Sequence, residues 1–211
     1  MQSKKGGRTR LLIYGSTLLT ELCIEAIELH SDEYMIVGQI PNKKPPLVGG
    51  QQIYPPHKVP YDIKLSIQYD SIIKELTNAF NLHTGLLPEW GGCDILYHTL
   101  KTGVKEQGLT FHKMTKNLDE GPIISKIIYP ILSTDDVEKI YKRILNIAPN
   151  FLLANLNLIN NEMEELIKTP ALKPIMYKKG HIDEKDKEEY IKTGEKLSLI
   201  CRSYDRTRKF L

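Results

Sequence analysis

Two short polar segments between apolar stretches carry the side chains best suited to chemistry. Asn81 and His83 follow an apolar strand and a short helix, and Asp119 follows an alternating strand that ends near Met114. In open α/β sheets, ligands bind beyond the carboxyl ends of the strands, where such turns lie. An imidazole, an amide and a carboxylate that converge there can transfer protons and stabilise an oxyanion. A lone histidine close to a proline is more often structural.

The elements that must position these residues begin with the pattern of a parallel α/β fold. Residues 11–14 are typical of a buried strand, residues 18–29 space their apolar side chains as a helix does, and residues 34–40 form a second apolar run. Strand, turn, helix and strand at this spacing begin a parallel sheet. The turn at Gly15 lacks the G-x-G-x-x-G motif of dinucleotide-binding proteins.

The later segments extend the predicted sheet to about five to seven strands with helices on both faces. They are a strand at 62–69, a short helix at 70–79, a helix at 94–102 ended by Gly103, strands at 108–114 and 123–131, and a turn at 117–122. A helix then begins at the capping box Ser133-x-x-Asp136, and Pro149 should kink or interrupt it. We expect residues 1–160 to form the main domain, and the Lys- and Glu-rich residues 161–211 to form a C-terminal extension packed on it.

Composition argues against several classes of protein. The 211 residues are 41% hydrophobic and 26% charged, with a net charge of +3, which is ordinary for a soluble globular protein. So small a positive surplus does not favour a nucleic-acid binder, and no stretch suits a signal peptide or a membrane span. Cys23, Cys93 and Cys201 are too scattered for a disulfide framework or a metal site. We therefore expect a cytoplasmic protein without metal, membrane or nucleic-acid partners.

The two polar segments resemble linked motifs of the formyltransferases that use 10-formyltetrahydrofolate. Asn81, His83, Leu86-Leu87-Pro88 and Gly92 are similar to N-x-H-x-S-L-L-P-x-x-R-G, and Gly108, Thr110, His112, Leu118, Asp119 and Gly121 to G-x-T-x-H-x-x-x-x-x-L/I-D-x-G. The spacing between the two motifs also fits, and weaker similarity extends over residues 10–205. The resemblance implies an α/β, Rossmann-like formyltransferase fold, with residues 1–160 as the catalytic domain.

The resemblance also implies roles for individual residues. Asn81, His83 and Asp119 correspond to the family's catalytic set. The co-substrate would contact two segments, namely Ile67, Gln68, Tyr69 and Asp70 after one strand, and Thr115, Lys116, Asn117 and Leu118 in a later turn. An amine that attacks the formyl carbon creates an oxyanion, for which the Asn81 amide and a His83 N–H are suitable donors. Asp119 would pair with His83, raise its pKa and relay the amine proton, and no metal is needed.

Departures from the motifs bear on the acceptor pocket. The family's serine after the histidine is Gly85 here, and the arginine of R-G is Gly91, which removes a cationic anchor or a structural ion pair. The chain is also shorter than the family near residues 59–62 and between Tyr69 and Asn81. We expect these differences to affect the acceptor more than the transfer chemistry.

Further similarities indicate which amine accepts the formyl group. The glycinamide ribonucleotide enzymes of purine biosynthesis normally have a G-x-G-x-N phosphate turn where this chain has Gly15-Ser16-Thr17-Leu18. The methionyl-tRNA enzymes carry a further barrel for which we expect no room. The loop at 40–56 and the tail resemble those of nucleotide-sugar N-formyltransferases. The predicted acceptor is therefore the amine of a dTDP- or UDP-linked amino-dideoxysugar, and the resemblance suggests a homodimer.

Four more side chains are candidates for contact with such a sugar nucleotide. Lys43, Lys44 and Arg202 either meet its pyrophosphate or are solvated, and Trp90 either stacks on its base or sugar or packs in the core. His98 and His112 are interpreted as structural. Two other functions stay open, namely a glycinamide ribonucleotide formyltransferase and a non-catalytic protein that binds folate or a nucleotide sugar.

Overall fold

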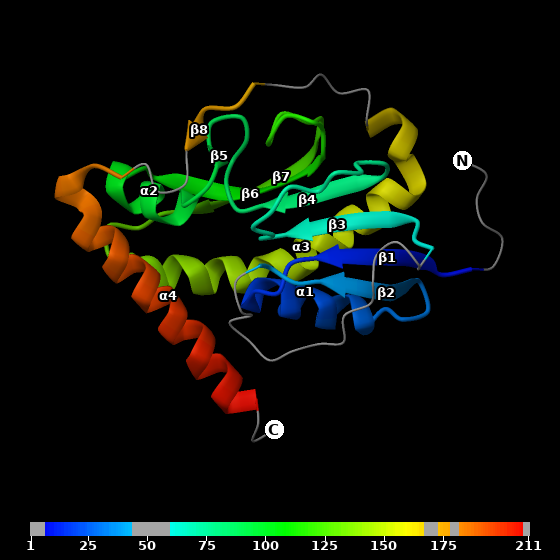
Figure 1. Cartoon of the computed structure of the whole chain (residues 1–211), viewed down its shortest axis with the longest axis horizontal. Coiled ribbons are helices and arrows are strands. Elements are labelled where there is room, and N and C mark those ends of the chain that lie inside the picture. Colours follow the sequence, from blue (N-terminus) through cyan, green and yellow to red (C-terminus); the bar gives the residue numbers. More distant parts are fainter. Residues whose placement is uncertain (1–6, 44–59, 167–172, 178–181, 209–211) are drawn as a thin grey trace.

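A six-stranded sheet, in the order β2-β1-β3-β4-β6-β7, forms the centre of the molecule. The computed structural model describes residues 7–43, 60–166, 173–177 and 182–208 (Figure 1). The strands are β1 (Thr9–Tyr14), β2 (Tyr34–Ile40), β3 (Ile63–Ile67), β4 (Ala79–His83), β6 (Glu106–Lys113) and β7 (Ile123–Pro130). Pairs β1–β2, β1–β3 and β3–β4 are parallel, whereas β4–β6 and β6–β7 are antiparallel. The prediction of a mostly parallel sheet flanked by helices is confirmed.

The helices and a small second sheet complete the described part of the chain. The helices are α1 (Leu18–Glu28), α2 (Ile95–Thr102), α3 (Val137–Leu166) and α4 (Lys187–Arg208), with a 3-10 turn η2 (Glu184–Asp186) before α4. The small sheet pairs β5 (Gly91–Gly92) with β8 (Met176–Tyr177). In Figure 1, α1 lies level with β2 near the bottom of the view, α3 crosses the view diagonally past β1 and β3, and the small sheet lies at the upper left. Helix α3 continues through residue 160, where we expect the main domain to end and the C-terminal extension to begin. The division into residues 1–160 and 161–211 stays a prediction.

The alternation of side chains along the strands separates the core from the candidate site. Leu65, Phe80 and Phe111 belong to one large buried cluster, to which α1, α3 and α4 contribute and against which α2 packs. All these helices therefore cover one face, and the described residues do not show the expected helices on both faces. Asn81 and His83 alternate with the core residues of β4, so they project from the opposite face of the sheet.

Two elements beside the candidate residues differ from the prediction. Residues 70–78 form bends and turns rather than a helix, and Asn81 and His83 lie inside β4 rather than in a turn. The Lys64 ammonium donates a hydrogen bond of 2.7 Å to the Glu75 carbonyl, which in a helix would accept from a backbone N–H. Phe80 and Leu82 are buried in the core and Asn81 between them is less buried, which is the period-two alternation typical of a strand.

Helix α3 begins later than predicted and continues past its proline. It begins at Val137, where the Asp136 carboxylate accepts the Lys139 N–H at 2.9 Å, so Asp136 itself caps the helix. Pro149 lies inside the helix and does not interrupt it, although an internal proline costs about 3 kcal/mol. Ala148 and Leu152 are fully buried on either side, and this packing holds the helix together.

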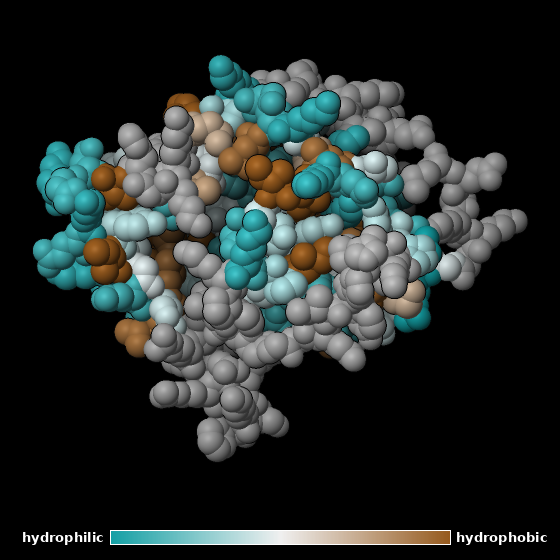
Figure 2. All heavy atoms as spheres, viewed as in Figure 1, coloured by the Kyte–Doolittle hydropathy of each residue, from teal (hydrophilic) through white to brown (hydrophobic). Residues whose placement is uncertain are grey.

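The surface mixes hydrophobic and hydrophilic side chains. Figure 2 shows hydrophobic side chains gathered near the middle of the visible face, between hydrophilic margins. Among the exposed large hydrophobic residues, Ile72 exposes 92% and Leu118 58% of its surface. Over the described ranges, no helix has the length and apolar character needed to cross a membrane.

Candidate active site

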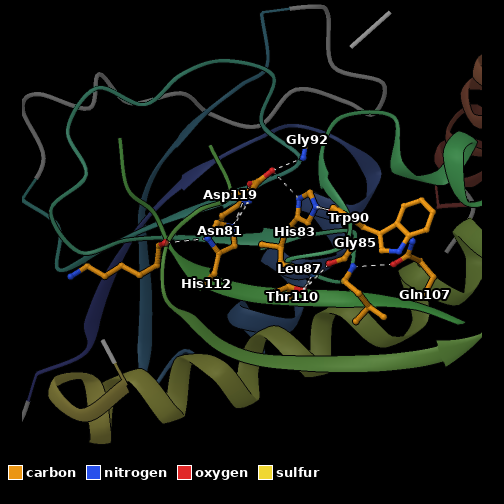
Figure 3. Close-up of polar contacts among 12 residues, drawn as sticks. Asn81, His83, Gly85, Leu87, Trp90, Gly92, Gln107, Thr110, His112 and Asp119 are labelled. Carbon is orange, nitrogen blue, oxygen red and sulfur yellow. Dashed lines mark hydrogen bonds and ion pairs between the residues drawn. The ribbon is translucent and has the colours of Figure 1, made fainter. Parts of the chain in front are cut away.

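Strands β4 and β6 place an amide and two imidazoles on one face of the sheet. In their antiparallel register, Asn81 pairs with His112 and His83 pairs with Thr110. Residues two apart on a strand share a face, so all four side chains project to the same side. Figure 3 shows that Asn81, His83 and His112 point toward Asp119, which reaches them from the loop between β6 and β7.

Asp119 is held by hydrogen bonding and by an unusual backbone conformation. Its Oδ2 atom accepts the Gly92 N–H at 2.7 Å and lies 3.8 Å from His83 Nδ1, and its Oδ1 atom lies 3.5 Å from His112 Nε2. Its φ of 56° is in the left-handed region, which Asp and Asn adopt more readily than other non-glycine residues. This conformation turns a buried carboxylate toward both histidines.

Backbone carbonyls determine which nitrogen of each neutral histidine carries the proton. His83 Nε2 lies 2.6 Å from the Trp90 carbonyl, which can only accept, so Nε2 donates and the lone pair is on Nδ1, facing Asp119. His112 Nδ1 similarly donates to the Lys113 carbonyl at 3.1 Å. The His112 Nε2 atom then accepts from the Asn81 amide at 3.1 Å, which leaves one amide hydrogen for a ligand.

Burial dominates the electrostatics of this group. It lowers the pKa of His83 below 6.5, although the Asp119 charge and the Trp90 carbonyl act in the opposite direction. Asp119 therefore acts on this pKa in the expected upward direction, but the net shift is downward because desolvation of the imidazolium is the larger effect. Burial also opposes ionisation of Asp119, but the neighbouring His112 and His83 side chains and the Gly92 N–H together hold its pKa below 3.8.

We expect the lowered pKa of His83 to make stability fall as the solution is acidified below pH 6.5. Between the lowered folded-state pKa and 6.5, the unfolded chain binds more protons than the folded chain, so the free energy of unfolding rises with pH in this window. Asp119 affects the free energy of unfolding at lower pH, because its stabilising contribution is lost as the pH falls from 3.8 through its own lowered pKa. Urea unfolding at a series of pH values tests this. A His83→Gln variant with the same pH dependence as the wild type would contradict it.

Hydrogen bonds to β6 hold the turn that follows β4. The Thr110 hydroxyl accepts the Leu87 N–H at 3.0 Å and donates to the Gly85 carbonyl at 2.7 Å, and Gln107 Oε1 accepts the Leu86 N–H at 2.9 Å. Gly85 lies against His83, because a Cβ atom there would be 2.6 Å from the Trp90 carbonyl and 2.9 Å from His83 Nε2. The absence of the motif's serine therefore lets the Trp90 carbonyl approach the histidine.

We expect Thr110→Val to reduce the free energy of unfolding by about 2 kcal/mol. The substitution keeps the shape of the side chain but leaves the Leu87 N–H and the Gly85 carbonyl without their buried partner. Chemical denaturation measures the loss. Thr110→Ser keeps the hydroxyl and should lose clearly less, and equal losses in the two variants would show that the methyl group rather than the hydroxyl matters.

The two predicted co-substrate segments lie on either side of β4. Residues 67–70 follow β3, whose Ile67 pairs with Leu82, whereas residues 115–118 are exposed and follow Met114, whose N–H bonds to the Ala79 carbonyl. Tyr69 and Met114 pack against a small apolar cluster that Leu12, Tyr14 and Ile73 form. Ile67 is fully buried and its carbonyl accepts the Thr20 hydroxyl, so its contribution to a ligand site is limited to its position beneath the neighbouring residues.

The four residues predicted to contact the acceptor are not seen to converge in the described part of the structure, unlike Asn81, His83 and Asp119. The Trp90 ring is buried and points away from His83 in Figure 3, so the structure favours packing over stacking on a ligand. Lys43 is exposed, and its backbone N–H donates to Asp70 Oδ1 at 3.1 Å. Lys44 and the side chain of Arg202 lie outside the described residues.

Sequence reasoning missed His112 and two backbone groups. His112 contacts both Asn81 and Asp119, and its place in the second motif was the available signal. The Trp90 carbonyl and the Gly92 N–H are backbone groups, so no pattern of residue types predicts their role. In the described ranges, no three His, Cys, Asp or Glu side chains are grouped to hold a metal ion.

Comparisons with known proteins bear on this arrangement of side chains. A sequence model described as formyl transferase matches residues 69–156. The "Bifunctional polymyxin resistance protein ArnA" of Wigglesworthia glossinidia brevipalpis is 32% identical over 129 residues, which cover 58% of this chain but only 20% of that protein. The chain thus spans well under two thirds of this relative's length.

Solved structures show the same fold. An N-formyltransferase from Helicobacter canadensis, in complex with folinic acid and dTDP-3-aminofucose, gives a TM-score of 0.67 at 23% identity, covering 83% of this chain and 72% of the other. A glycinamide ribonucleotide transformylase from Symbiobacterium toebii gives 0.62 at 20% identity, covering 76% and 93%.

Proposed function

We propose that the chain, which a formyl transferase sequence model matches over residues 69–156, belongs to that family and transfers the formyl group of 10-formyltetrahydrofolate to an amine. The observation that carries the proposal is the convergence of Asn81, His83 and Asp119 on one face of the sheet. These are the side chains that the two motifs nominate, and they come from one strand, β4, and from the loop between β6 and β7.

The geometry supports a division of labour in the transfer. The neutral amine forms a bond to the formyl carbon, and the carbonyl oxygen gains negative charge. The Asn81 amide hydrogen that His112 does not take stabilises this oxygen, by roughly 3–4 kcal/mol for one well-placed donor. His83 accepts the amine proton at Nδ1, where the Asp119 carboxylate stabilises the imidazolium. The bond to the folate nitrogen then breaks as that nitrogen takes the proton. The His83 Nε2 hydrogen serves the Trp90 carbonyl instead of the oxyanion.

The surroundings of the group suit a folate. Tyr69, in the first predicted segment, and Met114, directly before the second, pack against one apolar cluster on the site's face of the sheet. Leu118, in the second segment, exposes 58% of its surface. A flat pteridine ring buries apolar surface and hydrogen-bonds along its edges, and backbone groups of such loops can provide those bonds. The Helicobacter canadensis enzyme of the same fold was solved with folinic acid.

The proposed acceptor is the amine of a dTDP- or UDP-linked amino-dideoxysugar. The same Helicobacter canadensis enzyme was solved with dTDP-3-aminofucose. The first βα turn argues against glycinamide ribonucleotide, because side chains already bind the N–H groups that a phosphate would use. The Ser16 N–H donates to Asn42 Oδ1 at 2.8 Å, and the Thr17 and Thr20 N–H groups bond to each other's side chains at 3.2 and 3.3 Å.

A test incubates the purified chain with 10-formyltetrahydrofolate and a panel of amines, followed by mass spectrometry. The panel contains dTDP- and UDP-linked amino-dideoxysugars and glycinamide ribonucleotide. One added formyl group on a sugar supports the proposal, whereas product from glycinamide ribonucleotide alone assigns the chain to purine synthesis. Folate binding without transfer to any amine would identify a non-catalytic binding protein.

A further inference from the structure

The two side chains that move protons in the proposed mechanism take backbone partners from the same short segment. His83 Nε2 donates to the Trp90 carbonyl at 2.6 Å, and the Gly92 N–H donates to Asp119 Oδ2 at 2.7 Å. In Figure 3 both bonds approach the site from the same side of it. The relative placement of imidazole and carboxylate therefore depends on how residues 90–92 are held.

A segment from far along the chain holds those residues on their outer side. The Ile175 N–H donates to the Pro88 carbonyl at 2.8 Å, and the Gly91 N–H donates to the Ile175 carbonyl at 2.9 Å. In the β5–β8 pair, Gly91 is in register with Met176. These bonds fix residues 88 and 91, which bracket Trp90.

Contacts of α4 and of the turn η2 that precedes it hold residues 94–101. The Tyr190 hydroxyl donates to Asp94 Oδ2 at 3.2 Å, and the Tyr190 ring meets the Tyr97 ring edge-on with centroids 5.3 Å apart. Lys101 forms an ion pair with Asp186. The C-terminal region thus contacts residues 88–101 at several points.

Gly91 is what allows this close approach. A Cβ atom at Gly91 would lie 2.7 Å from Pro174 Cβ and 2.9 Å from Met176 Sδ, closer than side-chain carbon atoms pack. Where the motif has arginine, this chain has the one residue that leaves room for Pro174. Pro174 is buried, whereas Ile175 exposes 63% and Met176 38% of its surface.

We propose that Pro174–Met176 is a positioning element of the active site, which holds residues 88–92 so that the Trp90 carbonyl and the Gly92 N–H aim His83 and Asp119 at each other. The inference rests on the proposed function for its kinetic consequence, but not for its structural one. Residues of the C-terminal extension would then set the rate of formyl transfer without touching either substrate.

Gly91→Ala tests the proposal in the full-length protein. The added methyl group should displace Pro174–Met176, lower kcat by about a hundredfold with little change in KM, and leave the protein folded. Nitrogen-15 NMR of histidine should show that the His83 ring loses its single Nε2–H tautomer. This signal requires no turnover, so it decides the positioning role even if the chain transfers no formyl group.

Matched variants separate positioning from general disruption. Gly91→Ala/Pro174→Gly removes the clashing carbon and should restore both the His83 signal and kcat, while Gly194→Ala, on exposed α4 with open space around it, should leave both unchanged. Ile175→Pro removes the N–H that donates to the Pro88 carbonyl, and it should have the same effects on kcat and on the His83 signal as Gly91→Ala. It therefore provides the test if Gly91→Ala does not fold. Wild-type His83 signals in Gly91→Ala and Ile175→Pro would overturn the proposal, as would a fall in kcat without a change in these signals.

Discussion

Asp119→Asn is expected to lower kcat for formyl transfer by about a thousandfold while the protein stays folded. The amide keeps the size of the side chain, can still accept the Gly92 N–H through its oxygen, and tolerates the left-handed backbone at this position. It removes the negative charge that faces His83 Nδ1 at 3.8 Å and His112 Nε2 at 3.5 Å. An imidazolium formed at His83 in the transition state then has no counter-charge in a buried site.

Single-turnover kinetics with 10-formyltetrahydrofolate and the accepted amine measure this effect, and circular dichroism checks the fold. Asp32→Asn, on an exposed turn, makes the same chemical change away from the site and should retain the wild-type rate. A kcat for Asp119→Asn within about threefold of wild type would show that the proton takes a route that does not need this carboxylate.

The sequence predicted which side chains meet at the candidate site better than it predicted the local structure that holds them. Residue types at motif spacing nominated Asn81, His83 and Asp119, and the antiparallel register of β4 and β6 brings all three together. Asp119 lies in a turn as expected, but Asn81 and His83 were also expected in a turn, because the apolar positions Phe80 and Leu82 were not recognised as part of a strand. A strand of five residues offers too few alternations to be distinguished from the end of a helix.

The features that sequence reasoning could not provide depend on tertiary contacts. The position of the proton on His83 is set by the Trp90 carbonyl. Every residue type has a backbone carbonyl, so the sequence at position 90 does not indicate this contact. The lowered pKa of His83 follows from burial that exceeds the effect of Asp119, and a sequence gives the partner but not the burial. Gly91 illustrates the same limit, since its meaning as a docking point for Pro174 appears only when residues far apart in the chain meet.

His83→Gln is expected to lower kcat by about a thousandfold or more at nearly unchanged stability. The glutamine Nε2–H can replace the histidine Nε2–H as donor to the Trp90 carbonyl, so the turn after β4 keeps its anchor. The group at the position of Nδ1 is then a carbon atom, which cannot take a proton beside Asp119. Rates of transfer and urea unfolding of the same protein samples report the two effects separately.

His83→Asn is the matched variant with the opposite pattern of hydrogen bonds. Its amide reaches the position of Nδ1 and can contact Asp119, but it leaves the buried Trp90 carbonyl without a donor, at a cost of about 1–3 kcal/mol. Both variants should lose transfer, because neither offers a titratable nitrogen, and only His83→Asn should lose stability. If His83→Gln kept the wild-type rate, His83 would be a structural anchor of the turn rather than a proton acceptor. If both variants lost stability equally, the Trp90 bond would not be what holds residues 83–92 in place.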